Sequence, residues 1–330
     1  MRHASHRDSR TFNRVRQRRH VSDLDDAKTI DRLRAAVNSR LADLVGSSAA
    51  MPDRLGRSMR HSLLAPGKRV RALIAVLAAE HHGADGLAAL GPACALEMVH
   101  AASLVLDDLP AMDDSRLRRG LPANHCVYGE GTAILAAIGL MNRAFAVVSA
   151  DGSLGAGQRL EIIDALSWAI GGEGLIAGQE LDLHNDASLA SVGGIEQMHG
   201  RKTGALFAAA ALVGAIVAGA GPELRAGARR FGWRLGIAFQ TFDDLVDRFA
   251  TSDAALKETG KDAAKPTVVA LVGPERALGR ARRHLAAALG DIADIDRASL
   301  LVRYVGGLGD GLLARLEGRN LELADGLSRR

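Results

Sequence analysis

Two clusters of aspartates are the residues best suited to chemistry, because each follows an apolar run. The first cluster lies in LDDLPAMDDSRLRRG at 106–120 and consists of Asp107, Asp108, Asp113 and Asp114. The second lies in FQTFDDLVDR at 239–248 and consists of Asp243, Asp244 and Asp247. Oxygen ligands without His or Cys suit a hard cation, Mg²⁺ before Zn²⁺. One cluster alone is typical of a solvated helix end, but two such clusters predict Mg²⁺ bound together with substrate phosphates.

Basic residues flank the same apolar segments, as binding of phosphate requires. They are Lys68, Arg69 and Arg71 in PGKRVRA, Arg118 and Arg119 after the first cluster, Lys202 in RKTG, and Lys257, Lys261 and Lys265 in KETGKDAAK. Arginine forks bind phosphate oxygens in pairs, and lysine supplies a point charge. Each basic pair alone fits a solvated surface, but beside the acidic clusters the pairs favour a metal-bridged polyphosphate.

On a regular helix, Asp243 and Asp247 of the second cluster share a face, whereas Asp107 and Asp113 of the first cluster do not. Asp243 and Asp247 are four residues apart, so both carboxylates lie on one face of a helix. Asp107 and Asp113 differ by about 240° on a regular helix, because six residues advance ~100° each. Pro110 lies between them and disfavours regular helix. We therefore expect a bulge that re-aims Asp113.

The elements that position these residues are helices. Apolar residues recur at spacings of three and four from Ile30 to Leu44, and Ser22 with Asp25 resembles a capping box at the start of that helix. Similar Ala- and Leu-rich runs occupy 69–80, 92–106, 132–148, 160–169, 204–219, 222–245 and 274–289. No run alternates as a strand would, and no hairpin signal occurs. The pattern predicts an all-α fold, a single-domain bundle of about ten helices whose core can hold a site.

Composition narrows the class of protein. Of 330 residues, 48% are apolar and 24% charged, which excludes a disordered or fibrous chain. Aromatic residues at 3% argue against a nucleic-acid partner. The two cysteines, Cys94 and Cys126, cannot form a disulfide scaffold and fit a reducing, cytoplasmic compartment. The uncharged stretch 203–222 is long enough for a membrane span, but its Ala and Gly content favours a buried helix, so no span is expected.

The first twenty residues differ from the rest of the chain. They contain seven Arg and one Asp, whereas the whole chain has a net charge of only +4. The segment has almost no apolar residues, so residues 1–21 are predicted to be a disordered basic tail and residues 22–330 the folded domain. A transit peptide or a tether for an anionic surface is the alternative.

The order of the motifs resembles one enzyme family. GKRVR, DDLPAMDD followed by RRG, GQELD, KTG, FQTFDDLVD and the lysines of KETGKDAAK follow the order of the trans-isoprenyl diphosphate synthases over roughly residues 30–290. The first aspartate motif is most similar to that of bacterial geranylgeranyl diphosphate synthases of the carotenoid and diterpene type. One departure is Ala72, where the family usually has Pro after GKRxR.

The resemblance implies roles for individual residues. Mg²⁺, with Mn²⁺ as a substitute, would be held by Asp107, Asp108, Asp113, Asp243, Asp244 and Asp247. The allylic diphosphate would be bound by Arg118, Lys202, Thr203, Gln240, Lys257 and Lys265. Isopentenyl diphosphate would be bound by Lys68, Arg71, His100 and Arg119. The catalytic group would comprise these aspartates other than Asp247, with Lys202, Thr203 and Gln240. Gln179 and Asp182 would line the cavity.

The implied activity is condensation of isopentenyl diphosphate with dimethylallyl, geranyl or farnesyl diphosphate. It gives geranylgeranyl diphosphate and diphosphate in the deep apolar cavity of a homodimer. Alternatives are a farnesyl or longer-chain synthase, and a non-catalytic subunit of a heteromeric synthase. Ala102 and Ser103, five and four residues before Asp107, are small where farnesyl-producing relatives carry a bulky aromatic. Small residues predict the twenty-carbon product; alternatively, they only let two helices pack closely.

Overall fold

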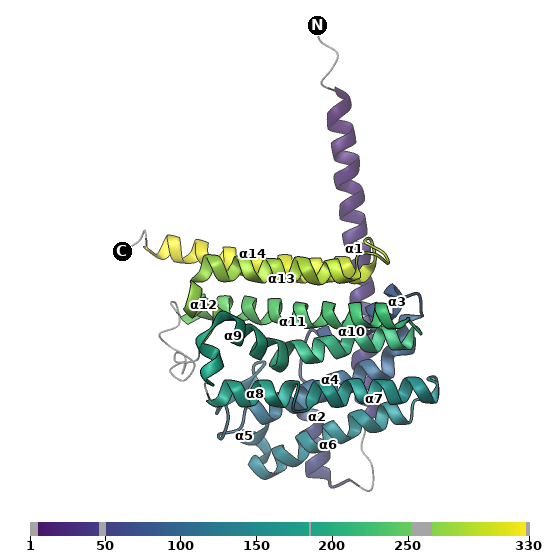
Figure 1. Cartoon of the computed structure of the whole chain (residues 1–330), viewed down its shortest axis with the longest axis vertical. Helices are drawn as coiled ribbons and strands as arrows, with labels where there is room; N and C mark the ends of the chain where they lie inside the picture. The colour runs from purple at the N-terminus through teal and green to yellow at the C-terminus, as the bar shows by residue number, and fades with distance from the viewer. Residues whose placement is uncertain (1–5, 46–50, 185, 252–265, 328–330) are drawn as a thin grey trace.

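The computed structural model describes residues 6–45, 51–184, 186–251 and 266–327. Nearly all of these residues are helical, which confirms the all-α prediction, and Figure 1 shows the helices stacked in layers. The predicted phosphate-binding residues Lys257, Lys261 and Lys265 lie outside the described residues.

Each helical run predicted from the sequence corresponds to a helix. These helices are α1 (His6–Leu44), α3 (Val70–His81), α4 (Leu90–Asp107), α6 (Glu130–Ser149), α7 (Ala156–Ile170), α10 (Ala205–Val217), α11 (Pro222–Thr251) and α13 (Pro274–Ile292). Segments not singled out in the sequence add α2 (Asp53–Leu63), α5 (Asn124–Tyr128), α8 (Leu175–His184), α9 (Val192–His199), α12 (Val268–Val272), α14 (Leu300–Leu327) and the short turns η1 (Gly86–Ala89), η2 (Ala187–Ala190) and η3 (Gly200–Gly204). The described chain thus exceeds the expected ten helices, partly because five-residue helices such as α5 and α12 are too short to show a periodic pattern.

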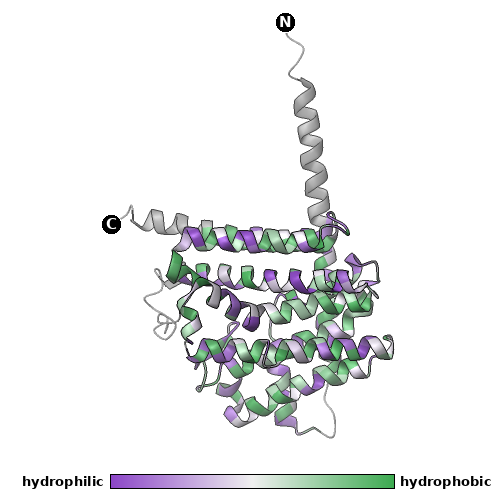
Figure 2. Cartoon of the chain, viewed as in Figure 1, coloured by the Kyte–Doolittle hydropathy of each residue, from purple (hydrophilic) through white to green (hydrophobic). Residues whose placement is uncertain are grey.

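Helix α10 lies at the centre of the core. Every side chain from Ala205 to Ala211 is buried, and α10 packs against α3, α7 and α11. Small alanine side chains let these neighbours approach closely. The expectation of a buried helix in the uncharged stretch is therefore confirmed. By contrast, α11 and α13 alternate hydrophobic and hydrophilic residues in Figure 2, as amphipathic helices at a surface do.

Helix α1 differs from the sequence prediction at its start. It begins at His6, so the structure has helix where a disordered tail and a capped start at Ser22 were expected. Figure 1 shows this part of α1 extending away from the other helices. Residues 6–21 contain neither Pro nor Gly, so nothing local interrupts the helix. Its later part buries Leu33, Val37 and Leu41 as the stripe predicts. The domain boundary at residue 22 stays a prediction.

Three helical stretches are long and apolar enough to cross a membrane by length and composition alone: Gly86–Asp107, Glu130–Ser149 and Val192–Val217. The first and third are 72% and 78% buried within the fold, so their apolar side chains are covered by protein. The second, α6, is only 39% buried and exposes apolar residues.

A two-stranded ribbon of β1 (Leu117–Arg118) and β2 (Leu121–Pro122) follows the first aspartate cluster, although no hairpin was expected. Its turn residues Arg119 and Gly120 have φ of 54° and 77°, the two positive values of a type I′ turn. Strands of two residues are too short to show alternation, which is why the sequence pattern misses them. The ribbon fixes the positions of both arginines that follow the acidic cluster.

Candidate active site

The first aspartate cluster lies where α4 ends. The helix stops at Asp107, and the N–H of Asp113 donates to the Asp107 carbonyl at 2.9 Å, which closes a wide turn around Pro110. Asp114, with φ of 48°, completes the turn by donating its N–H to the Leu109 carbonyl at 3.0 Å. The expected departure from helical geometry is therefore present, and it brings Asp113 within electrostatic reach of Asp107.

Asp107 is largely removed from water at this helix end. Burial raises the pKa of its carboxyl from 3.8 to about 6, against the opposing effect of the Lys202 ammonium. The negative charge of Asp113 raises the Asp107 pKa further. Carboxylates crowded in this way gain when a cation joins them.

Asp108 faces a different partner from its neighbour. Its side chain is buried, and it accepts hydrogen bonds from Arg118, one of them from Nε at 2.9 Å. Burial raises the pKa of Asp108 while the contact with Arg118 lowers it. In this structure Asp108 holds the ribbon arginine, so its predicted role as a metal ligand competes with a contact within the protein.

The second aspartate cluster shows the same division on α11. Gln240 Nε2 donates to Asp244 Oδ1 at 3.2 Å, and His199 Nε2 lies 3.4 Å from Asp244 Oδ2. Burial raises the pKa of Asp244 to about 7, and the charges of Asp243 and Asp247 raise it further. Asp244 is thus enclosed by protein groups, whereas Asp247, one turn later on the helix, is exposed.

The RKTG motif forms a π-helical turn, η3, between α9 and α10. Lys202 Nζ donates to Asp182 Oδ2 at 2.6 Å, and Thr203 Oγ1 donates to Gln240 Oε1 at 2.9 Å. The structure therefore brings together Lys202, Thr203 and Gln240, which the resemblance assigned to one substrate. Asp182, for which a position lining the cavity stays a prediction, is the partner of the lysine.

Glycines allow this turn to sit against two helices. A Cβ atom at Gly178 would lie 2.2 Å from the Lys202 backbone nitrogen, and one at Gly236 would lie 2.3 Å from the Gly204 Cα. Only glycine permits backbones this close. The turn is therefore held closely between α8 and α11.

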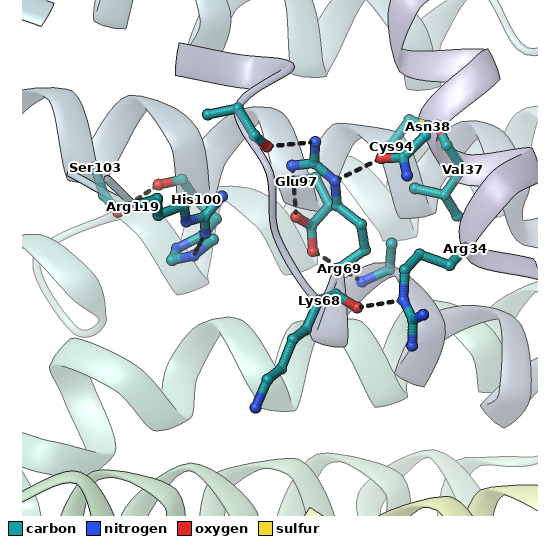
Figure 3. A network of polar contacts seen from close by, with 12 residues as sticks. Arg34, Val37, Asn38, Lys68, Arg69, Cys94, Glu97, His100, Ser103 and Arg119 are labelled. Carbon is teal, nitrogen blue, oxygen red and sulfur yellow. Dashed lines mark hydrogen bonds and ion pairs between the residues drawn. The ribbon is translucent and has the colours of Figure 1, made fainter. Parts of the chain in front are cut away.

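In the GKRVR segment, the side chains of the neighbouring residues Lys68 and Arg69 point in different directions. Arg69, in the left-handed region with φ of 52°, is buried and pairs with Glu97 at 3.7 Å, and its Nε donates to Asn38 Oδ1 at 2.8 Å. Figure 3 shows Lys68 directed away from this buried pair. Glu97 Oε1 also accepts the N–H of Ala72 at 3.2 Å, a bond that the family's usual Pro could not donate. Alanine at position 72, where the family usually has proline, therefore provides a backbone N–H that binds the buried Glu97 carboxylate.

A second group of cations lies beside α4. Arg119 Nη2 is 3.3 Å from His100 Nε2 (Figure 3), and the Arg71 guanidinium carbon lies 4.7 Å from the Phe207 ring centroid. Burial, opposed by the charges of Glu97 and Asp243, lowers the pKa of Arg71 to about 10, so it stays positive at neutral pH. Burial and the surrounding arginines hold the pKa of His100 well below 6.5, so its imidazole is neutral.

Three neighbours of the site were not predicted as site residues. Arg34 on α1 borders a hollow of about 800 Å³ together with Lys68 and Phe239. His199 lies against Asp244, and Glu97 fixes Arg69. His199 lies three residues before Lys202, and this closeness to the RKTG motif could have marked it as a site residue. Arg34 lies in no motif, so nothing in the sequence marks it.

The donor set fits a divalent metal that is shared with a ligand. Among the residues the structure describes, no three His, Cys, Asp or Glu side chains gather closely enough to hold a metal ion unaided. Mg²⁺ typically takes one or two carboxylates and completes its shell with waters and phosphate oxygens. Crowded aspartates with pKa values raised to about 6 and about 7 match that requirement.

The raised pKa of Asp107 predicts a pH-dependent gain in stability for Asp107→Asn. The folded, metal-free protein binds this proton more tightly than the unfolded chain, so the stabilisation is complete below pH 3.8 and is lost as pH rises through about 6. We expect Asp107→Asn in EDTA to exceed wild type by on the order of 2 kcal/mol at high pH. Melting curves at pH 5 and pH 7.5 measure the gain. A gain equal at both pH values, or matched by the exposed control Asp164→Asn, would contradict the assignment.

Comparison with known proteins agrees with this geometry. A model of the polyprenyl synthetase family matches residues 52–302. The geranylgeranyl diphosphate synthase of Pantoea ananas is 41% identical over 272 residues, which span 81% of this chain and 87% of that protein. The farnesyl diphosphate synthase of Geobacillus stearothermophilus is 36% identical over 260 residues, spanning 76% and 86%. The crystal structure of an FPP/GFPP synthase from Zymomonas mobilis has a TM-score of 0.74 at 28% identity and covers 86% of this chain and 96% of that one. The motifs, the helical fold and these matches show that the chain belongs to the polyprenyl synthetase family and is a prenyltransferase.

Proposed function

We propose that this enzyme condenses isopentenyl diphosphate with an allylic diphosphate to give geranylgeranyl diphosphate. The observation that carries the proposal is the presence of two separate groups of cations. Lys202 and Arg118 lie near aspartates of the first cluster, whereas Arg71 and Arg119 lie with the neutral imidazole of His100. Two groups suit two diphosphates, one bridged by metal and one not.

Divalent metal, preferably Mg²⁺ with Mn²⁺ as a substitute, would be held at the rim by the flanking aspartates. These are Asp107, Asp113, Asp243 and Asp247. When bound, the metal would act as a Lewis acid that neutralises charge on the departing diphosphate. Lys202 and Arg118 would stabilise the same oxygens, and Thr203 with Gln240 would orient them.

The residues around the reacting carbons need to exclude water more than to act as bases. An allylic carbon that loses diphosphate becomes electrophilic, and the double bond of isopentenyl diphosphate attacks it. A proton then leaves the adjacent carbon, and the released diphosphate is the base that we assign. Buried residues of α4 and α10 such as Val105 and Leu206 would form a dry wall that prevents hydrolysis.

Simple measurements distinguish the proposed function from the competing ones. A farnesyl or longer-chain synthase would differ in product length, and a non-catalytic subunit would lack activity alone. Loss of motif carboxylates would favour the subunit, but both clusters are intact in this sequence. We place the enzyme in the cytoplasm, in line with its two free cysteines.

Turnover should depend on the metal and on both aspartate clusters. Purified enzyme with isopentenyl diphosphate and each allylic diphosphate should form a twenty-carbon product, EDTA should abolish turnover, and Mg²⁺ should restore it. Asp107→Ala and Asp243→Ala should each lower kcat by about 10²–10³-fold, because charge on the leaving group is no longer neutralised. Product chromatography measures length, and circular dichroism checks the fold. Near-normal turnover of either variant, with Asp164→Ala as the exposed control, would refute the metal role.

Product length should respond to the small residues on α4. Ala102 is fully buried, and Ser103 donates its hydroxyl to the His100 carbonyl at 2.9 Å, so neither projects a bulky group. One helical turn advances ~5.4 Å, close to one extended isoprene unit. Tyrosine at Ala102 or, in a separate variant, at Ser103 should block the chain one unit early and shift the product to farnesyl diphosphate. If both variants are folded, active and still make the twenty-carbon product, other walls set the length.

We infer that the active form is a homodimer joined through α6. This helix exposes Ile134, Leu135 and Ile138 by 40%, 59% and 56%, which is unusual for a helix otherwise rich in apolar residues. Light scattering should give twice the chain mass for wild type. Leu135→Glu should lower that mass toward the monomer, whereas Leu271→Glu, an exposed leucine on α12, should not. A monomeric wild type, or equal effects of the two substitutions, would contradict the inference.

A further inference from the structure

His199 occupies a buried position beside Asp244 of the second aspartate cluster. It is the last residue of α9, its side chain is 3% exposed, and its Nε2 lies 3.4 Å from Asp244 Oδ2. That oxygen is buried and accepts no hydrogen bond in the structure, and the imidazole nitrogen beside it is a group able to donate one. A buried carboxylate oxygen that accepts no hydrogen bond costs free energy. A closer contact between the imidazole N–H and this oxygen is therefore favourable.

Asp244 connects this histidine to residues assigned to the allylic diphosphate. Its other oxygen, Oδ1, accepts from Gln240 Nε2 at 3.2 Å. Gln240 Oε1 in turn accepts from Thr203 Oγ1 at 2.9 Å. A chain of polar contacts therefore runs from His199 through Asp244 and Gln240 to Thr203. Because Asp244 and Gln240 each have two partners, a change at one end alters the orientation of the next member.

The start of this chain is held firmly by another helix. Glu196, one turn before His199 on α9, pairs with Arg280 of α13 through both oxygens at 2.6 and 2.8 Å. His284 of α13 contacts the same carboxylate at 3.0 Å. On the other side, a Cβ atom at Gly200 would lie 2.3 Å from the Trp233 ring. These contacts hold the end of α9, from which the buried His199 side chain extends to Asp244.

We propose that His199 is a positioning residue, which acts through Asp244 to orient Gln240 and Thr203 toward the allylic diphosphate. The proposal rests on the proposed function for the identity of the ligand but on this contact chain for its mechanism. His199 touches neither substrate nor reacting atoms. It should affect the allylic side of the site and leave the group of Arg71, His100 and Arg119 unchanged.

The test combines kinetics with a double-mutant cycle. His199→Ala should raise KM for the allylic diphosphate about tenfold, the size of effect that loss of a supporting contact has around metal sites. KM for isopentenyl diphosphate should be unchanged. His199→Gln, which retains an N–H donor, should recover most of the loss, and the control His184→Ala, an exposed histidine on α8, should match wild type. In the background Gln240→Ala, the effect of His199→Ala should fall below about twofold, because the contact chain is already broken.

Calorimetry with inorganic diphosphate and Mg²⁺ gives a second measurement that needs no turnover. It should show the same pattern of weakened binding and loss of additivity, with melting temperatures recorded for each variant. Additive effects of the two substitutions, equal changes in both KM values, or wild-type binding by folded His199→Ala would overturn the proposal. If wild type fails to make a prenyl product, the proposed function fails, and the calorimetric cycle still decides the role of His199.

Discussion

The burial of carboxylates is the constraint on which the site depends. Asp107 and Asp244 lie at separate helix positions where burial raises their pKa values, and each has further aspartates nearby. Such an arrangement opposes folding unless the surrounding structure holds it. The fold does so with rigid contacts: the Lys202–Asp182 pair, the Arg118–Asp108 pair, and a π-helical turn fixed by glycine contacts. In the proposed function, cations that bind here would offset the cost of these buried charges.

The burial of carboxylates also explains a feature that the two aspartate motifs share. In each, the middle aspartate turns to protein partners, Arg118 for Asp108 and Gln240 with His199 for Asp244. Two adjacent carboxylates cannot both be stabilised by the same few cations, so one is paired within the protein. In both DD pairs the second aspartate is therefore a residue that holds neighbouring side chains in place.

Much of the fold could be predicted because apolar periodicity reports packing directly. The buried stripe of α1 and the uncharged α10 are examples, and the aspartate clusters locate the site by composition. Contacts between distant segments could not be predicted. His199 meets Asp244, and Arg34 meets the Lys68 segment, only because helices pack in a particular order. The ribbon escaped detection because two-residue strands carry no pattern, and the start of α1 because charge alone does not decide helix formation.

The type I′ turn of the ribbon has an evolutionary consequence. Arg118 and Arg119 are adjacent in the chain, yet one contacts Asp108 and the other His100. The turn needs both positive φ values, and Gly120 supplies one of them. A single-residue insertion or deletion here would transfer each arginine to the wrong neighbour at once. Substitution is therefore the change that the ribbon tolerates best, because insertions and deletions disturb the contacts to Asp108 and His100 together.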